Sequence, residues 1–378
     1  MTKDVKILVF PGDGIGKEVI PEGVRVLRAL ERGFRGLFRV HTTSVNWGID
    51  YYKEQLARGA GKNAGVVPED FVERLKRSGC DAILLGALGD PATLPDHVTL
   101  APLIAMRQGL EQYVCLRPAR LYPGVRTPLA TTRPIDIAVV RENSEGEYAC
   151  NGGRFRAGTA DEVATEVSIH TRKGAERIVR YACDLALRRR GHVTLATKSN
   201  ALKYGMVLWD RVFDDVVREY NGRLARAGKK GLRADKCHVD ALAMDFVRRP
   251  HTLDVVVGSN LFGDILSDLG GAIVGSLGLA PSANINPERR YPSMFEPVHG
   301  SALDIAGRRI ANPVGTIRAV SMMLAHLELP APAAALDRAL EDHFARAPLT
   351  ARTPDLGGSA HTEDVTTDIL RRIKYDEF

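Results

Sequence analysis

Short apolar runs alternate with longer amphipathic segments along this chain, which is the pattern of an α/β protein. Apolar residues recur at helical spacing through 17–32, which predicts a helix there. Strands are predicted at 5–10, 81–86, 135–141, 192–197 and 253–258. No internal repeat and no low-complexity linker marks a domain border.

A glycine turn, Gly12-Asp13-Gly14-Ile15-Gly16, joins the first strand to the first helix. It does not match the dinucleotide-binding fingerprint G-x-G-x-x-G, and no acidic residue is plainly placed after a following strand to hold a ribose. A glycine-rich turn of this kind can still bring backbone N–H groups near a phosphate. A tight structural turn is the alternative.

The 378 residues are 44% hydrophobic and 26% charged, which is ordinary globular composition for two domains or one large one. The N-terminus lacks a signal-peptide layout, and no apolar stretch has the length of a membrane span. Five cysteines are scattered without a C-x-x-C pair, so each is interpreted as a small buried hydrophobe. These features predict a cytoplasmic protein with no membrane partner.

The net charge is +6, but the basic residues are not collected into one long run. We interpret Arg188, Arg189 and Arg190 as a solvated helix end, where cations suit the helix dipole. Nucleic-acid binding is therefore not expected, although binding of RNA through basic charge stays an alternative.

The strongest candidate for chemistry is an aspartate pair, Asp264 and Asp268. On a helix, this spacing places both carboxylates on one face, one turn apart. Like charges repel there unless a cation joins them, and a third carboxylate, Asp240, follows a strand-like segment. Oxygen ligands of this kind suit Mg²⁺ or Mn²⁺. The alternative is a pair of aspartates that merely favours the helix dipole.

Other residues could serve an acidic substrate or move protons. Arginine forks bind carboxylates bidentately, so Arg107, Arg117 and Arg141 together would hold a di- or tri-acid, although each alone could be an ion-paired surface residue. Lys198 and Tyr148 could exchange protons if burial or a metal shifted their pKa values. The segment 296–302 could bind a nucleotide or be only a turn.

Taken together, these segments resemble the β-decarboxylating dehydrogenases, which include isocitrate, isopropylmalate, homoisocitrate and tartrate/D-malate dehydrogenases. The resemblance runs from the glycine turn to 353–360, and its most specific pieces are 260–268 and 296–304. It implies two α/β domains that share a central sheet, in a fold distinct from the Rossmann fold. It places residues 1–112 and 275–378 in a cofactor-side domain and 113–274 in a second domain for dimerisation and for metal and substrate.

The resemblance also implies a role for each candidate residue. Arg107, Arg117 and Arg141 would hold the carboxylates of the substrate, and Asp240, Asp264 and Asp268 would hold the metal. Lys198 would be the base and Tyr148 the acid, with Lys198 and Asp240 supplied by the neighbouring subunit of a homodimer. The residues expected at the cofactor are Asn200, Glu296, His299, Gly300, Ser301, Ala302, Asp304 and Asn312.

The cofactor is predicted to be NAD, because the Asp304 carboxylate would accept hydrogen bonds from ribose hydroxyls and repel a 2′-phosphate. Substrate choice is expected at Leu100, Ala101 and Leu103. Isocitrate enzymes carry a serine and an asparagine in place of Ala101 and Leu103, so isocitrate is disfavoured. The segments 95–100 and 111–114 look most like tartrate/D-malate dehydrogenases, which indicates a malate-like 2-hydroxy acid.

Two alternatives stay open. Ala101 replaces the tryptophan usual in tartrate/D-malate enzymes, and a larger pocket would suit a bulkier 3-substituted malate of the isopropylmalate, homoisocitrate or phosphonomethyl malate type. A non-catalytic, regulatory family member is the alternative of another class. The presence of the full set of arginines, aspartates, Lys198 and Tyr148 argues against it.

Overall fold

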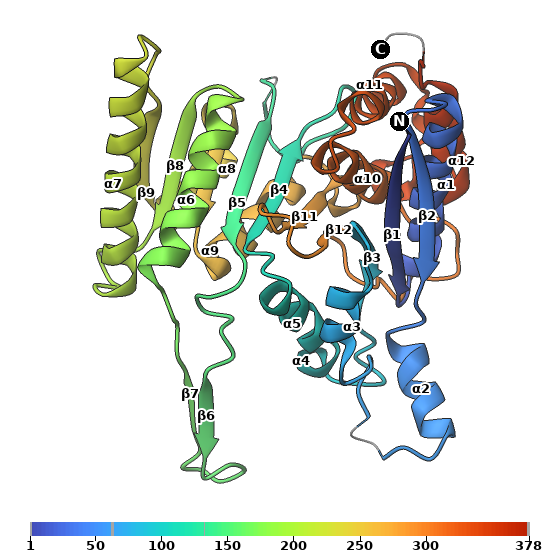
Figure 1. The fold of residues 1–378 in the computed structure, drawn as a ribbon, viewed down its shortest axis with the longest axis horizontal. Coiled ribbons are helices and arrows are strands. Elements are labelled where there is room, and N and C mark those ends of the chain that lie inside the picture. Colours follow the sequence, from blue (N-terminus) through green and yellow to red (C-terminus); the bar gives the residue numbers. More distant parts are fainter. Residues whose placement is uncertain (1, 62–63, 132, 376–378) are drawn as a thin grey trace. The chain divides into compact units, whose positions relative to one another are not determined.

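The computed structural model describes residues 2–61, 64–131 and 133–375. The chain forms two compact units (Figure 1). The first unit consists of Met1–Leu110, Leu121–Ala130 and Val274–Phe378, and the second of Glu111–Arg120 and Thr131–Ile273. Each unit is thus assembled from segments that are separated in sequence.

The sheet of the first unit is mostly parallel. Its strand order is β2 (Phe38–Ser44), β1 (Lys3–Gly12), β3 (Ala82–Ala87), β12 (Ser293–Pro297) and β11 (Pro281–Ile285). Only β11 runs antiparallel to its neighbour β12, while β2, β1, β3 and β12 are parallel. The helices are α1 (Gly16–Gly33), α2 (Ile49–Ala57), α3 (Phe71–Arg77), α4 (Asp96–Thr99), α5 (Ala101–Gly109), α10 (Val314–His326), α11 (Pro330–Arg346) and α12 (Thr362–Arg371).

The core of the first unit lies on both faces of this sheet. Alternate strand residues, such as Leu8 and Phe10 of β1, point to one face because side chains in a strand alternate. There they pack with residues of α2, α3 and α5, including Tyr52, Phe71 and Met106. Helices α1 and α10 pack on the same strands and bury their own apolar residues.

The second unit has its own strands in the order β4 (Val114–Arg120), β5 (Asp136–Glu142), β10 (Val255–Gly258), β8 (His192–Thr197) and β9 (Arg233–His238). Strands β5, β10, β8 and β9 are parallel, and β4 is antiparallel to β5. Helices α6 (Arg172–Leu187) and α7 (Gly205–Arg226) lie on one face, and α8 (Val239–Arg248) and α9 (Asn260–Ile273) on the other (Figure 1).

A two-stranded hairpin, β6 (Gly152–Phe155) and β7 (Val163–Glu166), extends away from the sheet of the second unit (Figure 1). Every residue of both strands is exposed. Four apolar side chains on or beside it are at least 38% exposed: Phe155, Val163, Val167 and Ile169. Single exposed apolar side chains are common on protein surfaces, but a group of them on one projecting element often marks an interaction site.

Most predicted elements are confirmed. The helix expected at 17–32 is α1, and the expected strands are β1, β3, β5, β8 and β10, with ends that differ by a few residues. The predicted solvated helix end is wrong for Arg189, whose Nε donates to Oδ1 of the buried Asp254 at 2.8 Å. The prediction that all cysteines are buried holds for Cys115 and Cys183, but Cys80 and Cys237 are only partly buried and Cys150 is exposed.

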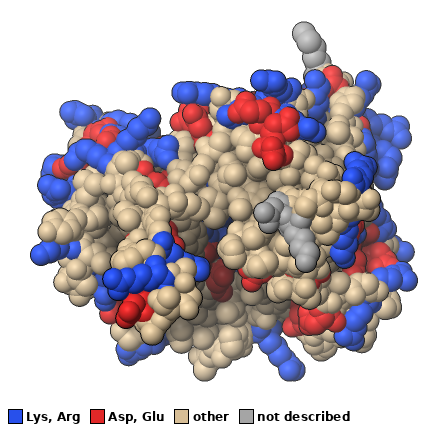
Figure 2. Space-filling view, turned by 90° about the horizontal axis from the view of Figure 1, so that it is seen from below, with Lys and Arg blue, Asp and Glu red and all other residues tan. Residues whose placement is uncertain are grey.

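Acidic and basic side chains are interspersed on the face drawn in Figure 2. Many of the arginines are ion-paired, as Arg180 is with Glu176 and Glu219. The net positive charge is therefore not gathered into a band on this face. Within the described residues, no helix combines the length and the apolar character needed to cross a membrane.

Candidate active site

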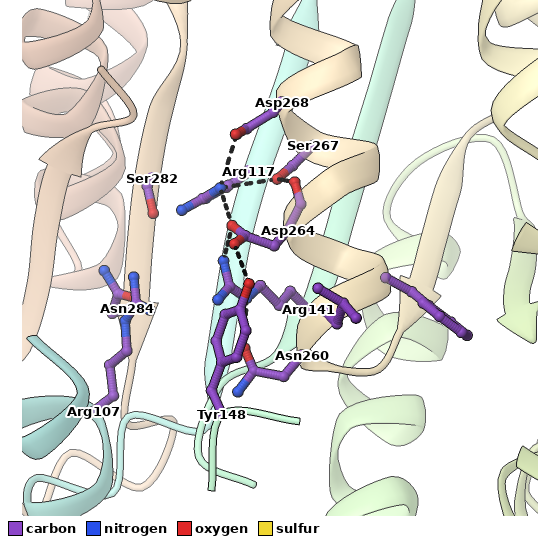
Figure 3. A network of polar contacts seen from close by, with 12 residues as sticks. Arg107, Arg117, Arg141, Tyr148, Asn260, Asp264, Ser267, Asp268, Ser282 and Asn284 are labelled. Atoms are coloured by element: carbon purple, nitrogen blue, oxygen red, sulfur yellow. Dashed lines mark hydrogen bonds and ion pairs between the residues drawn. The ribbon is translucent and has the colours of Figure 1, made fainter. Parts of the chain in front are cut away.

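The predicted carboxylate pair lies on one helix, as expected. Asp264 and Asp268 stand one turn apart on α9, and Nη1 of Arg117 donates to both, at 3.0 and 3.2 Å (Figure 3). The same Nη1 atom donates to the hydroxyl of Ser267 at 3.0 Å. A single guanidinium from strand β4 thus offsets the charge of both carboxylates.

Arg141 and Tyr148 complete this group around Asp264. The Nη1 atom of Arg141 donates to Oδ1 of Asp264, and the hydroxyl of Tyr148 donates to Oδ2 at 2.9 Å (Figure 3). Arg141 is buried, and its Nε donates to Oδ1 of Asn260 at 2.9 Å. Its guanidinium carbon lies 5.3 Å from the centre of the Tyr148 ring. The phenol and two arginines therefore meet at one carboxylate.

The packing between α9 and β5 depends on Gly263. A Cβ atom on that residue would lie 2.5 Å from Cβ of Arg141. No side chain larger than hydrogen fits without displacing the helix or the strand. Gly263 thereby holds Asp264, its neighbour in the chain, next to Arg141.

Burial and charge shift the proton affinities in this group. Burial, together with the nearby negative charge of Asp264, raises the pKa of Tyr148 to about 12. The phenol therefore carries its proton at neutral pH. Burial also raises the pKa of Asp268, although the charge of Arg117 acts in the opposite direction.

Lys198 and Asp240 form a separate pair in the second unit. Lys198 follows β8 and Asp240 follows β9, so both stand at the carboxyl ends of parallel strands, as do Arg141 on β5 and the start of α9 after β10. The Nζ atom of Lys198 lies 2.9 Å from Oδ1 of Asp240. The hydrogen bond from Lys198 lowers the pKa of Asp240.

The three expected metal ligands are not brought together within one chain. Among residues 2–61, 64–131 and 133–375, no three or more His, Cys, Asp or Glu side chains gather in a way that could hold a metal ion. Asp264 and Asp268 share Arg117, whereas Asp240 pairs with Lys198.

Arg107 lies in the first unit with its own polar partners. It is buried in α5, and its Nε donates to Oδ1 of Asn284 at 3.1 Å (Figure 3). Its Nη2 atom lies 3.6 Å from Oε1 of Glu296, and Nδ2 of Asn284 donates to the same oxygen at 2.7 Å. Glu296, which the resemblance places at the cofactor, thus contacts an expected substrate residue.

The glycine turn packs against the loop that was expected to bind the cofactor. The N–H of Ile15 donates to the carbonyl of Ser301 at 2.8 Å, and a Cβ atom on Gly14 would lie 2.0 Å from that oxygen. The buried Asp13 accepts the N–H groups of Ile49 and Gly89. The turn therefore has a structural role, because it connects the segment that follows β1 to the loop that follows β12.

The expected cofactor loop shows one buried atom without a partner. The Nε2 atom of His299 is buried and has no hydrogen-bond partner in the described part of the chain, and burial lowers the pKa of this imidazole. Ala302 adopts a φ of 40°, in the left-handed region, and Gly300 and Asp304 are exposed. The Asn312 side chain is engaged internally, through Asp355 and the N–H of Val314. In the second unit, Asn200 is exposed two residues after Lys198.

The three residues expected to choose the substrate lie around the start of α5. Leu100 is 41% exposed and Ala101 is exposed. Leu103 is half-buried and packs against the hydrophobic core of the first unit. Leu100 and Ala101 are thus accessible to a ligand, while Leu103 contributes part of its side chain to the hydrophobic core.

A family model described as isocitrate/isopropylmalate dehydrogenase matches residues 6–370 of the chain. The chain belongs to the isocitrate/isopropylmalate dehydrogenase family. It is 46% identical over 375 residues to a probable tartrate dehydrogenase/decarboxylase of Agrobacterium vitis, a match that covers 98% of each protein. It is 46% identical over 383 residues to the D-malate dehydrogenase (decarboxylating) of Escherichia coli, covering 99% of each.

Comparison with solved structures supports the same family. A crystal structure of isocitrate dehydrogenase from Methylococcus capsulatus matches with a TM-score of 0.82 at 32% identity, covering 98% of this chain and 99% of that one. The expected family and the expected fold class, a mixed α/β fold with a large central sheet, are confirmed.

Several residues of this family member support the expected site residues and were not singled out from sequence. Asn260 holds Arg141 and Asn284 holds Arg107, while Glu147 accepts the hydroxyl of Ser259 and the N–H of Leu261 at the start of α9. A side chain that orients another one has no characteristic spacing. Their place in the sequence was the one available indication, because Glu147 precedes Tyr148 and Asn260 begins the segment 260–268.

Proposed function

We propose that the protein catalyses the NAD-dependent and divalent-metal-dependent oxidative decarboxylation of a malate-like 2-hydroxy acid of the D-malate/tartrate type. The observation that carries this proposal is the convergence of Arg117, Arg141 and Tyr148 on Asp264. The two guanidiniums can bind the carboxylates of an anionic hydroxy acid, and the protein carboxylates can bind a divalent cation. The phenol can donate a proton.

The residues of α9 fit a divalent metal ion. Asp264 and Asp268 provide hard oxygen donors on one helical face, and the charge between them is at present offset by Arg117. A cation at the two carboxylates would release Arg117 and Arg141 to hold substrate carboxylates. When bound, Mg²⁺ or Mn²⁺ would polarise the hydroxyl and carboxylate of the substrate.

The loop residues fit a dinucleotide. The buried Nε2 atom of His299 lacks a partner in the described chain, and Gly300 is exposed beside it. NAD would accept the hydride that leaves C2 of the substrate. The exposed Asp304 carboxylate favours NAD over NADP, because it would accept hydrogen bonds from ribose hydroxyls and repel a 2′-phosphate.

Two protein side chains, Lys198 and Tyr148, would carry out the proton transfers. Lys198, as the neutral amine, would take the proton of the 2-hydroxyl as the hydride leaves C2 for NAD, and the bond to the carboxylate β to the new ketone would break to release CO₂. Tyr148, a phenol beside Asp264, would donate a proton to the carbon left behind. Arg107, Arg117 and Arg141 orient the carboxylates throughout.

We further propose a homodimer in which Lys198 and Asp240 of one chain complete the site formed by Asp264 and Asp268 of the other. The exposed apolar side chains of the β6–β7 hairpin support a self-association surface in the second unit. Met244, Val247 and Ile265, on α8 and α9, are also at least 46% exposed. In this proposal most of the expected cofactor residues belong to the first unit, and the expected dimerisation and metal residues belong to the second.

One observation favours a second candidate substrate. Ala101 is exposed and small at a position expected to face the substrate, and it leaves space for a 3-substituent. A bulkier malate, of the isopropylmalate, homoisocitrate or phosphonomethyl malate type, is therefore the alternative.

The test is a substrate panel with purified protein, Mn²⁺ and either NAD or NADP. D-malate, tartrate, isocitrate, isopropylmalate and a phosphonomethyl malate analogue are compared by kcat/KM. We expect turnover of D-malate or tartrate with NAD and loss of turnover in excess chelator. Best turnover with isocitrate would overturn the assignment from Ala101 and Leu103. Asp264→Asn should abolish metal-dependent turnover while the fold persists, and full activity in that variant would refute the metal site.

A further inference from the structure

Asp210 of α7 binds the two hydroxyl side chains that flank Lys198. The Oγ1 atom of Thr197 donates to Oδ1 of Asp210 at 2.6 Å, and Oγ of Ser199 donates to Oδ2 at 2.7 Å. Each oxygen of one carboxylate therefore holds one neighbour of Lys198. Hydrogen bonds to an ionised carboxylate are shorter and stronger than those between neutral groups.

The backbone around Lys198 is fixed by the same contacts. The Thr197 side chain is buried, and its hydroxyl also accepts the N–H of Ser199 at 3.3 Å. Past the lysine, the N–H groups of Ala201 and Leu202 donate to the Lys198 carbonyl at 3.0 and 2.9 Å. Asp210 thus ties a closed turn, whose centre is Lys198, to a long helix.

We propose that Asp210 is a positioning residue that sets the place of Lys198, and of Asn200 two residues later, by holding Thr197 and Ser199. This inference rests on the proposed function, in which Lys198 is the base. Asp210 itself is committed to two hydroxyl groups and needs no contact with substrate. A displacement of about 1 Å of a reacting group lowers rates by as much as about 100-fold.

The principal variant is Asp210→Ala, compared with Asp214→Ala as a matched control. Asp214 lies one turn further along α7 and forms an exposed ion pair with Lys236 at 2.6 Å. We expect Asp210→Ala to lower kcat about 10- to 100-fold, with KM values changed less than about threefold. Asp214→Ala should match the wild type.

Conservative variants separate positioning from a general loss of packing. Thr197→Ser keeps the hydroxyl and should retain most of the activity, whereas Thr197→Val removes it and should lower kcat as Asp210→Ala does. Asp210→Asn keeps one oxygen acceptor for two hydroxyl donors, so its kcat should lie between those of the wild type and Asp210→Ala. Equal kcat for Thr197→Ser and Thr197→Val would overturn the proposal.

Hydrogen exchange of the protein without ligands gives a readout independent of turnover. In Asp210→Ala, the amides of Ser199, Ala201 and Leu202 should exchange at least about tenfold faster, with α7 amides unchanged. Unchanged exchange at these amides overturns the positioning role, and so does the same loss of kcat in Asp214→Ala.

Lys198→Met distinguishes this inference from the proposed function. If Lys198→Met is inactive and Asp210→Ala is fully active, only the positioning role fails. If Lys198→Met keeps wild-type turnover, or the wild type turns over no substrate of the panel, the proposed function fails and the inference fails with it.

Discussion

The Nζ atom of Lys198 lies 2.9 Å from Oδ1 of Asp240 within one chain. Each chain thereby pairs the expected base with one expected metal ligand. Across the described ranges, no third carboxylate joins Asp264 and Asp268 into a metal-binding set. In the proposed homodimer, the Lys198–Asp240 pair of one chain would complete the site formed by these carboxylates in a second copy.

This arrangement predicts complementation between two inactive proteins. We expect chains carrying Lys198→Met and chains carrying Asp264→Asn each to be inactive as homodimers. After the two are mixed, unfolded and refolded together, half of the dimers are hybrids, and each hybrid holds one intact site. We expect about a quarter of wild-type activity to return.

A site built within one chain gives the opposite result. Each hybrid site would then carry one defect, and the mixture would remain inactive. Refolding each variant alone controls for reactivation, and steady-state NADH formation measures the recovered activity. The double variant Lys198→Met/Asp264→Asn refolded with wild type controls for the yield of hybrids.

The β6–β7 hairpin should be required for self-association. Replacing the exposed Phe155 and Val167 by glutamate places charges on a surface that we expect to be buried between copies. We expect the dimer to dissociate and activity to fall at least about tenfold. Sedimentation velocity and activity are measured on the same samples.

A charge placed on another exposed apolar residue supplies the control. Leu37 of the first unit is 41% exposed, and Leu37→Glu should leave both mass and activity unchanged. A monomeric double variant with full activity would contradict a site shared between chains.

Those helices and strands whose pattern of apolar residues depends only on nearby positions in the chain could be predicted from the sequence. The helical spacing of 17–32 and the apolar run of β5 depend on neighbours in the chain, and both predictions are confirmed. Arg189 shows the limit of such patterns. A helix end favours solvated cations, but the buried Asp254, distant in sequence, provides a stronger partner.

The candidate site was predictable in part for the same reason. The four-residue spacing of Asp264 and Asp268 fixes their common helical face, which the structure confirms. The partners of Arg107 were not predictable, because Asn284 follows it by 177 positions. The pairing of Lys198 with Asp240 likewise depends on the adjacency of β8 and β9, which neither strand encodes alone.

A larger residue at position 101 should narrow the range of substrates. Ala101 begins α5 and is exposed, so Ala101→Trp should fold normally. An indole would fill space beside the 3-position of a malate. We expect the ratio of kcat/KM for isopropylmalate to kcat/KM for D-malate to fall by about tenfold or more. Ala101→Ser adds little volume and should leave the ratio unchanged. An unchanged ratio in Ala101→Trp would show that position 101 does not face the 3-substituent.

The stability of the first unit should depend on the protonation of His326. Its Nε2 atom lies 3.1 Å from Oγ of Ser293, and its ring packs at 5.7 Å from that of Phe295. Burial, aided by the charge of Arg289, lowers the pKa of His326 to about 4. In the unfolded chain, His326 binds a proton near its ordinary pKa of 6.5. The free energy of unfolding therefore decreases as the pH falls from 6.5 to about 4.

His326→Gln isolates this effect, because glutamine offers a polar group to Ser293 but does not titrate. From pH 7 to pH 4, the wild type should lose at most about 3 kcal/mol of unfolding free energy more than the variant. Urea unfolding at fixed protein concentration measures both proteins at each pH, and the contributions of the carboxylates cancel in the difference. Well below pH 4 the two curves should run parallel, since the histidine is then protonated in both states. Parallel curves over the whole range would show that His326 titrates alike in the folded and unfolded chain.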